Sequence, residues 1–210
     1  HFALNAVAEG LNAPLQPGTI TEHSRPVSPS GELTTKSVGQ SIGALLPEGA
    51  IIADESATSG GPTYFLTQQC PRHSAMYLTG GGIGMGLPLA SGAAIAAPDR
   101  PVIALQGDGG AMYTLQALWT QAREGLNVTN IIFANRRYAI LQTEQERAGV
   151  TQPGPVAQSL MELNDPSIDF CALAKGMGVP AVRPSSAESF HGALRNALAE
   201  DGPHLIEVVV

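Results

Sequence analysis

The sequence predicts an α/β fold in which helices flank both faces of a doubly wound parallel sheet. Short apolar runs that end in polar residues recur along the chain, and amphipathic segments alternate with these runs. The runs are apolar at consecutive positions, as in strands that are buried on both faces. Strands that alternate with helices are joined by right-handed crossovers and lie parallel. The 210 residues are enough for one large domain and a tail.

The same patterns predict the order of the elements. Apolar residues at helical spacing predict helices at residues 1–14, 34–47, 112–125, 138–149, 170–178 and 186–203. Apolar runs predict strands at residues 50–54, 101–107, 128–135, 179–184 and 204–210, with a further strand after His73. Gly125 is expected to end the third helix. Three residues of that helix are expected to pack it against the sheet: Leu115, Leu118 and Trp119.

Residues 14–31 carry Pro, Ser and Thr without apolar periodicity, a composition typical of a linker or an extended crossing segment. We therefore place a domain boundary there, with residues 1–30 as a tail and residues 31–210 as the main domain. The helix predicted at residues 1–14 then lies on the tail side of this boundary.

Composition excludes several kinds of partner. The 11 Lys and Arg residues against 18 Asp and Glu residues give a net charge of −7, which provides no electrostatic footprint for nucleic acid or an anionic membrane. Apolar runs break well before the roughly 18 residues of a membrane span, and no signal-peptide pattern is seen, so a cytoplasmic protein is expected. Cys70 and Cys171 form no CxxC pair and are expected to be buried and reduced.

Two loops at predicted strand ends carry the residues best suited to bind a ligand. Sheets of this kind bind ligands at the carboxyl ends of their strands, where loops lead into helix N-termini. The run Gly-Asp-Gly-Gly at residues 107–110 follows a strand and opens a helix, so its backbone N–H groups can face a diphosphate. Its glycines permit close backbone approach, and Asp108 supplies a hard oxygen ligand for a divalent cation.

Asn135 lies 27 residues after Asp108, at the end of the next predicted strand, and offers a neutral amide oxygen. Mg²⁺ prefers octahedral oxygen coordination, which phosphate oxygens, a carboxylate, an amide, a main-chain carbonyl and a water provide together. Each loop alone has a plainer explanation, since Gly-Asp-Gly makes structural turns and Asn caps strand ends. Their combination on successive strands favours a site for magnesium and a diphosphate.

This pair of loops resembles the thiamine-diphosphate motif, in which Gly-Asp-Gly is followed after about two dozen residues by two asparagines. The pair is Ala134-Asn135 here, so the chain departs from the motif at the neighbour of the ligand and keeps the ligand. The resemblance implies that Asp108 and Asn135 hold Mg²⁺ together with the main-chain carbonyl of Arg137. It also implies that Gly109 and Gly110 contact the diphosphate.

The segment GGGIGMGLP resembles the part of that family which holds thiamine in its bent form. Ile83 takes the position of the apolar side chain under the cofactor. The Gly81 carbonyl would accept a bond from the aminopyrimidine, and Met85 would line the ring pocket. The plainer alternative is a glycine-rich turn between a strand and a helix. The segment fits neither G-x-G-x-x-G nor the P-loop pattern, which argues against a nicotinamide or P-loop site.

Further candidates lie after two predicted strands. Residues 54–59 resemble the family loop that reaches the diphosphate and borders the substrate, and Ser56, Ala57 and Thr58 are the candidates within it. The alternative is that Ser and Thr after a strand are ordinary turn or N-cap residues. Three residues follow the metal loop: Tyr138, Ile140 and Leu141. They are expected either to line the phosphate and substrate pocket or to be core residues of a short helix. The expected cofactor-binding residues are Gly81, Ile83, Met85, Gly107, Asp108, Gly109, Gly110, Asn135, Tyr138, Ser56, Ala57 and Thr58.

The resemblance covers about residues 31–210 and is closest to relatives of acetolactate synthase and benzoylformate decarboxylase. It implies the thiamine-diphosphate-binding fold, with thiamine diphosphate and Mg²⁺ as cofactors. It implies that residues 1–30 end a preceding middle domain, and that the glutamate which activates the aminopyrimidine lies in another domain, so no catalytic residue is expected here. The family builds its site between subunits, which implies an N-terminal pyrimidine-binding domain as partner and a homodimer or homotetramer.

The implied function is decarboxylation or carboligation of a 2-oxo acid by a lyase or transferase. Acetohydroxyacid synthases carry Gln-His-Leu-Gly-Met after the asparagine pair, whereas this chain has Arg-Arg-Tyr-Ala-Ile at residues 136–140, which favours the benzoylformate decarboxylase side. Two other functions stay open. One is a cofactor-binding module without turnover of its own, which is the outcome expected for these 210 residues alone. The other is a nucleotide-binding α/β domain.

Overall fold

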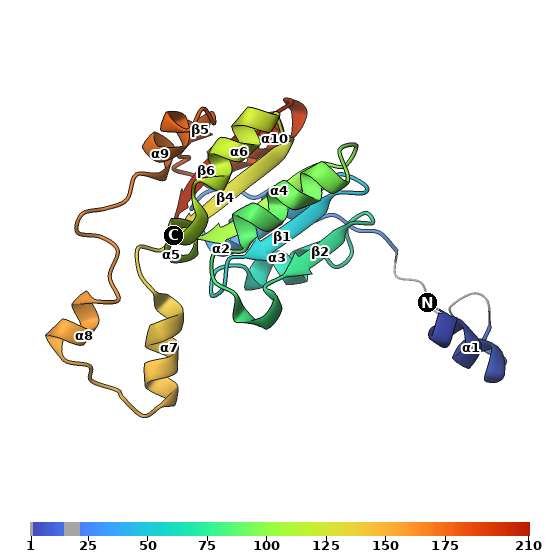
Figure 1. Ribbon diagram of the computed structural model, residues 1–210, viewed down its shortest axis with the longest axis horizontal. Coiled ribbons are helices and arrows are strands. Elements are labelled where there is room, and N and C mark those ends of the chain that lie inside the picture. The colour runs from blue at the N-terminus through green and yellow to red at the C-terminus, as the bar shows by residue number, and fades with distance from the viewer. Residues whose placement is uncertain (1, 15–21) are drawn as a thin grey trace.

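The structure is a computed structural model that describes residues 2–14 and 22–210. Six parallel strands form one sheet in the order β2-β1-β3-β4-β6-β5, and helices flank it, which confirms the predicted fold class (Figure 1). The strands are β1 (Ile51–Glu55), β2 (Ser74–Tyr77), β3 (Val102–Gly107), β4 (Val128–Ala134), β5 (Ala181–Val182) and β6 (His204–Val209).

The helices of the described residues include three that the sequence pattern did not predict, namely α3, α4 and α8. Helix α4 is apolar on almost every side, so it lacks the helical spacing of apolar residues that predicts an amphipathic helix. The helices are α1 (Phe2–Gly10), α2 (Thr35–Leu45), α3 (Gly61–Thr67), α4 (Gly86–Ala96), α5 (Asp108–Thr114), α6 (Ala117–Glu124), α7 (Ala139–Arg147), α8 (Pro155–Ser159), α9 (Phe170–Gly176) and α10 (Ala187–Ala199), with a 3₁₀ helix η1 (Thr79–Gly81).

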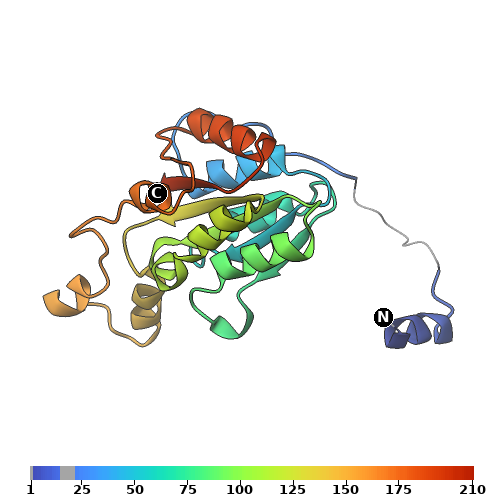
Figure 2. The ribbon, with the colours of Figure 1, turned by 45° about the horizontal axis from the view of Figure 1, so that its top comes forward.

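Two apolar cores lie on the two faces of the sheet. Successive side chains of a strand point to opposite faces, so in β4 Ile132 joins one core and Ile131 joins the other. Helices α4, α6 and α9 cover the first face, and α2 and α10 cover the second (Figure 2). Cys70 and Cys171 are buried and free, as predicted.

The prediction of one helix over residues 112–125 was wrong, because the chain turns at Leu115 and Gln116 and forms α5 and α6. The N–H groups of Leu118 and Trp119 bind carbonyls only three residues back, at 3.0 and 3.1 Å, which tightens the chain at this point. The break lets α5 follow the end of β3 while α6 packs against α4. Gly125 ends α6 in the left-handed conformation at φ 59°, as predicted.

Trp119 does not pack against the sheet, contrary to expectation. Leu118 is fully buried, whereas 53% of Trp119 is exposed. The Trp119 ring lies 5.5 Å from the guanidinium carbon of Arg123, one turn further along α6. Of the three residues predicted to pack against the sheet, Leu115 and Leu118 are therefore buried, and Trp119 lies outside the buried face of the helix.

The strand order places a crevice between β1 and β3. After β1 the chain moves outward to β2 and then returns to β3 on the other side of β1, so the order reverses between these two strands. Loops that leave neighbouring strands in opposite directions open a crevice at their carboxyl ends, where open sheets bind ligands. Glu55 ends β1 and Gly107 ends β3, so the segments that follow them border this crevice.

Two parts of the chain lie outside the layered body. Helix α1 has no buried residue, and α7 and α8 extend from the opposite side of the sheet (Figures 1 and 2). Of the predicted linker, residues 15–21 lie outside the described part of the chain. Within the described part, no helix has both the length and the apolar character needed to cross a membrane.

Replacing Leu118 with Ala is expected to lower the free energy of unfolding by about 2–5 kcal/mol, because the side chain is fully buried and leaves a cavity. Urea denaturation followed by circular dichroism measures this change. Trp119→Ala is the matched control on the same helix and is expected to cost about 1 kcal/mol or less. Equal losses for the two variants would contradict the observed orientation of α6.

Candidate functional site

Asp108 joins the loops that follow β3 and β4. It is the first residue of α5 and only 3% of it is exposed. One carboxyl oxygen accepts the N–H of Gly109 at 2.8 Å, and the other accepts the N–H of Arg136 at 2.6 Å. Burial raises the pKa of Asp108 above its ordinary value, and the bonds from Arg136 and Gly109 only partly offset this effect.

Asn135 follows β4 and turns its amide oxygen onto the same loop. Its Oδ1 accepts the N–H of Arg137 at 3.1 Å. Oxygens of Asp108 and Asn135 therefore bind the consecutive N–H groups of Arg136 and Arg137. Arg136 adopts a left-handed conformation at φ 58°, which bends the chain sharply between the strand end and α7.

The main chain of Arg137 faces the Asn135 side chain. On either side of it, the Arg136 carbonyl accepts the N–H of Leu163 at 2.7 Å, and the Tyr138 N–H donates to the Met161 carbonyl at 2.8 Å. These bonds point the neighbouring groups toward residues 161–163, while the Arg137 N–H donates to Asn135 in the other direction. An extended residue presents its N–H and carbonyl on the same side. The Arg137 carbonyl therefore lies on the side of Asn135.

Close packing explains the glycines of the GDGG run. A methyl group at Gly109 would lie 2.7 Å from Cδ1 of Tyr138, so the tyrosine ring rests directly on this glycine. A methyl group at Gly110 would lie 2.6 Å from Gln106 Nε2 and 2.7 Å from a carboxyl oxygen of Glu55. Gly107, at the end of β3, has extended backbone angles and precedes α5 directly.

The glycine-rich turn lies between β2 and α4. Gly81 ends η1 with φ 70°, and Ile83 projects from the turn with 59% of its surface exposed. Met85 is half-buried and caps α4. The Gly84 carbonyl accepts the Thr114 hydroxyl at 2.6 Å, which ties the turn to α5. Thus Gly81, Ile83 and Met85 sit on a turn that is anchored beside the GDGG run.

Glu55 and Gln106 lie beneath both loops and were not predicted as site residues. The carboxyl group of Glu55 accepts the N–H groups of Gly84 and Gly86, and only 6% of the residue is exposed. Gln106 is fully buried, and its side-chain oxygen has no hydrogen-bond partner among the described residues. A buried acidic residue at a strand end gives no motif of its own. Its position after the apolar run 50–54 is the signal available in the sequence.

The loop after β1 is less directly aimed at a ligand than the resemblance implies. Ser56 is buried, and both its N–H, at 2.8 Å, and its hydroxyl donate to Asp54 Oδ1. Ala57 and Thr58 are exposed, and Ala57 has a left-handed conformation at φ 47°. The Ala57 and Thr58 positions therefore remain open to a ligand, while the Ser56 hydroxyl is occupied.

A hollow of about 310 Å³ adjoins this loop, between the ends of β1 and β2 and the start of α3. Tyr64 and Tyr77 line it with ring centres 5.8 Å apart, and Asp54 and Ala57 lie at its wall. Burial, with added repulsion from the Asp54 carboxylate, raises the pKa of the Tyr77 hydroxyl. The hollow has an aromatic wall and an acidic rim.

Ile140 and Leu141 lie on α7, outside the core. They are 43% and 49% exposed, so neither is a core residue of the layered body. Leu141 lines an apolar groove between α7 and α8 together with Leu160 and Met161.

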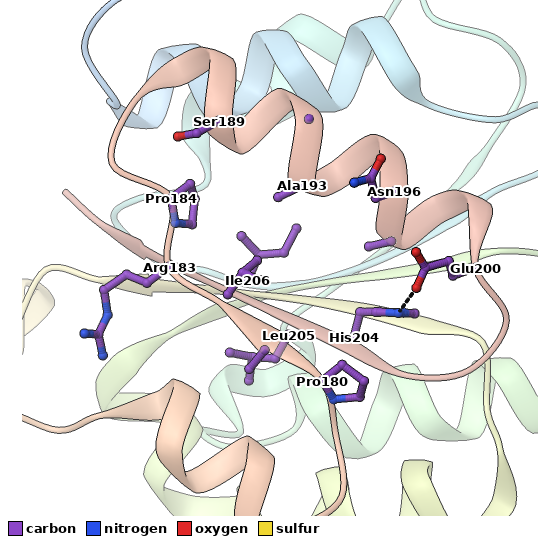
Figure 3. A pocket seen from close by; sticks show the side chains of 14 residues that line it. Pro180, Arg183, Pro184, Ser189, Ala193, Asn196, Glu200, His204, Leu205 and Ile206 are labelled. Carbon is purple, nitrogen blue, oxygen red and sulfur yellow. Dashed lines mark hydrogen bonds and ion pairs between the residues drawn. The ribbon is translucent and has the colours of Figure 1, made fainter.

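A separate hollow of about 560 Å³ lies between α10 and the edge formed by β5 and β6 (Figure 3). Ala193 and Asn196 of α10 border it, and at one end His204 Nε2 lies 3.2 Å from a carboxyl oxygen of Glu200, within hydrogen-bond distance. None of the predicted site residues lines it. The predicted site and this hollow are therefore distinct.

Taken together, the fold and the loops define a class of cofactor-binding α/β domain. The carboxyl ends of β3 and β4 present ligand oxygens of Asp108 and Asn135 next to glycines at a helix start, a set that suits a hard cation and an anionic group. The chain belongs to the family described as "Thiamine pyrophosphate enzyme, C-terminal TPP binding domain", which matches residues 59–208.

Individual relatives agree with this family. A Mycobacterium tuberculosis protein named "Putative acetolactate synthase large subunit IlvX" is 50% identical over 209 residues, 99% of this chain and 40% of that protein. Benzoylformate decarboxylase of Pseudomonas aeruginosa is 39% identical over 178 residues, 85% of this chain and 32% of that enzyme. The solved structure of the Rhodococcus jostii RHA1 thiamine diphosphate-dependent 4-hydroxybenzoylformate decarboxylase superposes with TM-score 0.82 and 31% identity, over 100% of this chain and 39% of that one.

These comparisons confirm the family resemblance, and two of the three names denote decarboxylases of benzoylformate or its 4-hydroxy derivative, which are 2-oxo acids. The chain spans 32% to 40% of the length of these relatives. It therefore corresponds to one part of each of them. The roles of individual site residues rest on the geometry described above.

Replacing Gly110 with Ala is expected to destabilise the ligand-free chain by about 1–3 kcal/mol, because the added methyl group meets Gln106 and Glu55 in a filled space. Gly92→Ala in α4 is the matched control. Nothing lies within 4 Å of its added methyl group, so this change is expected to be neutral or to stabilise by about 0.5–1 kcal/mol. Thermal or urea unfolding measures both, and a neutral Gly110→Ala would contradict the close packing beneath the loop.

Proposed function

We propose that this chain binds the diphosphate and Mg²⁺ of thiamine diphosphate as the C-terminal domain of a 2-oxo acid decarboxylase or carboligase. The observation that carries the proposal is the convergence of Asp108 and Asn135 on one loop, where their oxygens bind consecutive N–H groups. The N–H groups of Arg136 and Arg137 donate to these side-chain oxygens and hold both on one loop before any ligand binds.

The donor set fits magnesium better than softer metals. Asp108 offers a carboxylate, Asn135 an amide oxygen and Arg137 a main-chain carbonyl on the same side, and Mg²⁺ prefers oxygen ligands completed by phosphate and water. Ionised Asp108 is costly in its buried position, as its raised pKa shows, and a bound cation would offset that cost. The helix start at residues 108–110 would present the Gly110 N–H to the diphosphate, and the Gly109 N–H, which donates to Asp108 in the ligand-free chain, would join it when the cation takes over that oxygen.

The remaining residues orient the organic part of the cofactor. Ile83 projects from an anchored turn and would support the bent form of thiamine, with the Gly81 carbonyl and Met85 beside it. When bound, thiamine diphosphate supplies a carbanion that adds to the 2-oxo group and an electron sink for loss of CO₂. The share of this chain is to hold the cofactor in a fixed place near the substrate. Alone, these residues bind without turnover, and the activating glutamate belongs to another domain.

An aromatic 2-oxo acid is the substrate class that we propose. The hollow beside residues 56–58 has Tyr64 and Tyr77 in its wall, which suits the ring of such an acid more than the methyl group of pyruvate. The carboxylate of the substrate must then point away from Asp54, whose charge repels it. Two of the reported relatives carry names that denote such substrates. In this proposal Ile140 and Leu141, near the start of α7, line the side of the substrate pocket that faces α7.

Residues 1–30 are proposed to end the preceding domain, and the working enzyme to be a cytoplasmic homodimer or homotetramer. Helix α1 exposes apolar side chains, with Phe2 at 94% and Leu4 at 74%, as expected of a helix whose packing partner lies elsewhere. The exposed Val156 of α8 and Leu160 directly after it supply a second apolar surface, which fits contact with a pyrimidine-binding domain from another subunit.

Thiamine diphosphate and Mg²⁺ together are expected to raise the melting temperature of the chain, whereas NAD or ATP are not. At a hundredfold excess over the dissociation constant the gain is about 2.7 kcal/mol, or roughly 5–10 °C. Asp108→Asn is expected to abolish this gain, and Asp99→Asn, an exposed aspartate before β3, to keep it. Stabilisation by NAD or ATP in preference to thiamine diphosphate would refute the proposed function.

Asp108→Asn is also expected to change how the stability of the ligand-free chain depends on pH. A raised pKa in the folded chain means that ionised Asp108 costs stability above that pKa, and that the cost vanishes as pH falls toward the ordinary value of 3.8. The stability of the variant relative to the parent is therefore expected to improve as the pH rises above 3.8. A constant loss adds to this trend, because the amide replaces one of the two carboxyl oxygens that accept backbone N–H groups. Urea denaturation over this pH range tests it, and an advantage that grows toward low pH would contradict it.

A further inference from the structure

We propose that Glu55 is a positioning residue that holds the turn carrying Ile83 in the geometry that receives the thiamine part of the cofactor. This inference rests on the proposed function and adds a residue that touches neither the diphosphate loop by hydrogen bonds nor the proposed metal ligands. It concerns the ring part of the cofactor rather than its diphosphate.

The carboxyl group of Glu55 binds the turn at two points. One oxygen accepts the N–H of Gly84 and the other accepts the N–H of Gly86. These two donors lie on either side of Met85, and the first of them directly follows Ile83. Gly86 begins α4, so its N–H has no partner within the helix and needs an acceptor from elsewhere. Glu55 thus fixes both the path of the turn and the start of α4.

The turn has no freedom to relax around this contact. Gly84 has φ 87°, a conformation that favours glycine, and its carbonyl accepts the Thr114 hydroxyl at 2.6 Å. A methyl group at Gly84 would lie 2.6 Å from Cβ of Tyr113. The turn is therefore held between Glu55 on one side and α5 on the other, and Ile83 is the exposed residue at its outer surface.

Within the part of the chain that the structure describes, Glu55 forms hydrogen bonds with the turn proposed to bind the thiamine ring and none with the loop proposed to bind the diphosphate. Its carboxyl group lies where a methyl group at Gly110 would meet it, but among the described residues it accepts hydrogen bonds from Gly84 and Gly86. The diphosphate loop is instead held by Asp108 and Arg136. Loss of the Glu55 bonds should then loosen the ring-binding turn more than the diphosphate loop.

Glu55→Gln tests this separation with little change in shape. A side-chain amide has one oxygen acceptor and one NH₂ group, so one buried N–H of the turn loses its acceptor. We expect the dissociation constant for thiamine diphosphate with Mg²⁺ to rise about tenfold or more, and that for inorganic pyrophosphate with Mg²⁺ to change less than about threefold. Isothermal titration calorimetry measures both, and Glu48→Gln, at an exposed glutamate, is the matched control.

Three outcomes are distinguishable. A parent chain that binds neither ligand would overturn the proposed function and leave this inference without its ligand. A parent that binds both, with Glu55→Gln weakening both equally or neither, would overturn the positioning role while the proposed function stands. A selective loss of thiamine diphosphate affinity supports the role, because a residue that only stabilised the fold would weaken both ligands together.

A measurement on the unaltered chain covers the case in which Glu55→Gln does not fold. The N–H groups of Gly84 and Gly86 donate to Glu55 and not to water, so their hydrogen exchange should be at least a hundredfold slower than in an unfolded chain before any ligand is added. Exchange followed by NMR reads each amide separately. Fast exchange at both glycines in the ligand-free chain would overturn the proposal.

Discussion

The hydrogen bond from the Arg136 N–H to Asp108 is the contact on which the proposed site depends. It joins the loop after β3 to the loop after β4, and the same loop receives the amide oxygen of Asn135. Parallel pairing of β3 with β4 brings these loops to one edge, since Gly107 lies opposite Phe133. Hydrogen bonds to backbone N–H groups thus hold these side-chain oxygens in place. Ordering them in advance lowers the entropic cost of binding.

A layer of buried side chains lies beneath the loops that carry Asp108 and the glycine-rich turn. Glu55 and Gln106 lie at the ends of β1 and β3, the strands between which the sheet order reverses. Their side chains fill the space below Gly86 and Gly110, which is why these positions have no room for a Cβ atom. Burial makes this layer rigid and also makes ionised Asp108 costly, so a cation would relieve a cost that the ligand-free fold carries.

Most of the fold was predictable because its strands are uniformly apolar and its loops carry distinctive residues. The Asp108 and Asn135 loops were recognisable from spacing alone, and the structure brings both side chains to residues 136–137. Helix α4 was missed because a helix that is apolar all round has no amphipathic period. The break at Leu115 was not predictable, because it depends on how α6 packs against α4. The hydrogen bonds of Glu55 were not predictable either, because they reach residues 29 and 31 positions further along the chain.

A crystal structure of the chain with thiamine diphosphate and Mn²⁺ in place of Mg²⁺ tests the central claim most directly. Anomalous scattering locates the manganese ion without reference to the protein atoms. The predicted result is one peak within coordination distance, about 2.0–2.3 Å, of an Asp108 carboxyl oxygen, the Asn135 amide oxygen and the Arg137 carbonyl. A bound cofactor whose metal contacts neither Asp108 nor Asn135 would contradict it.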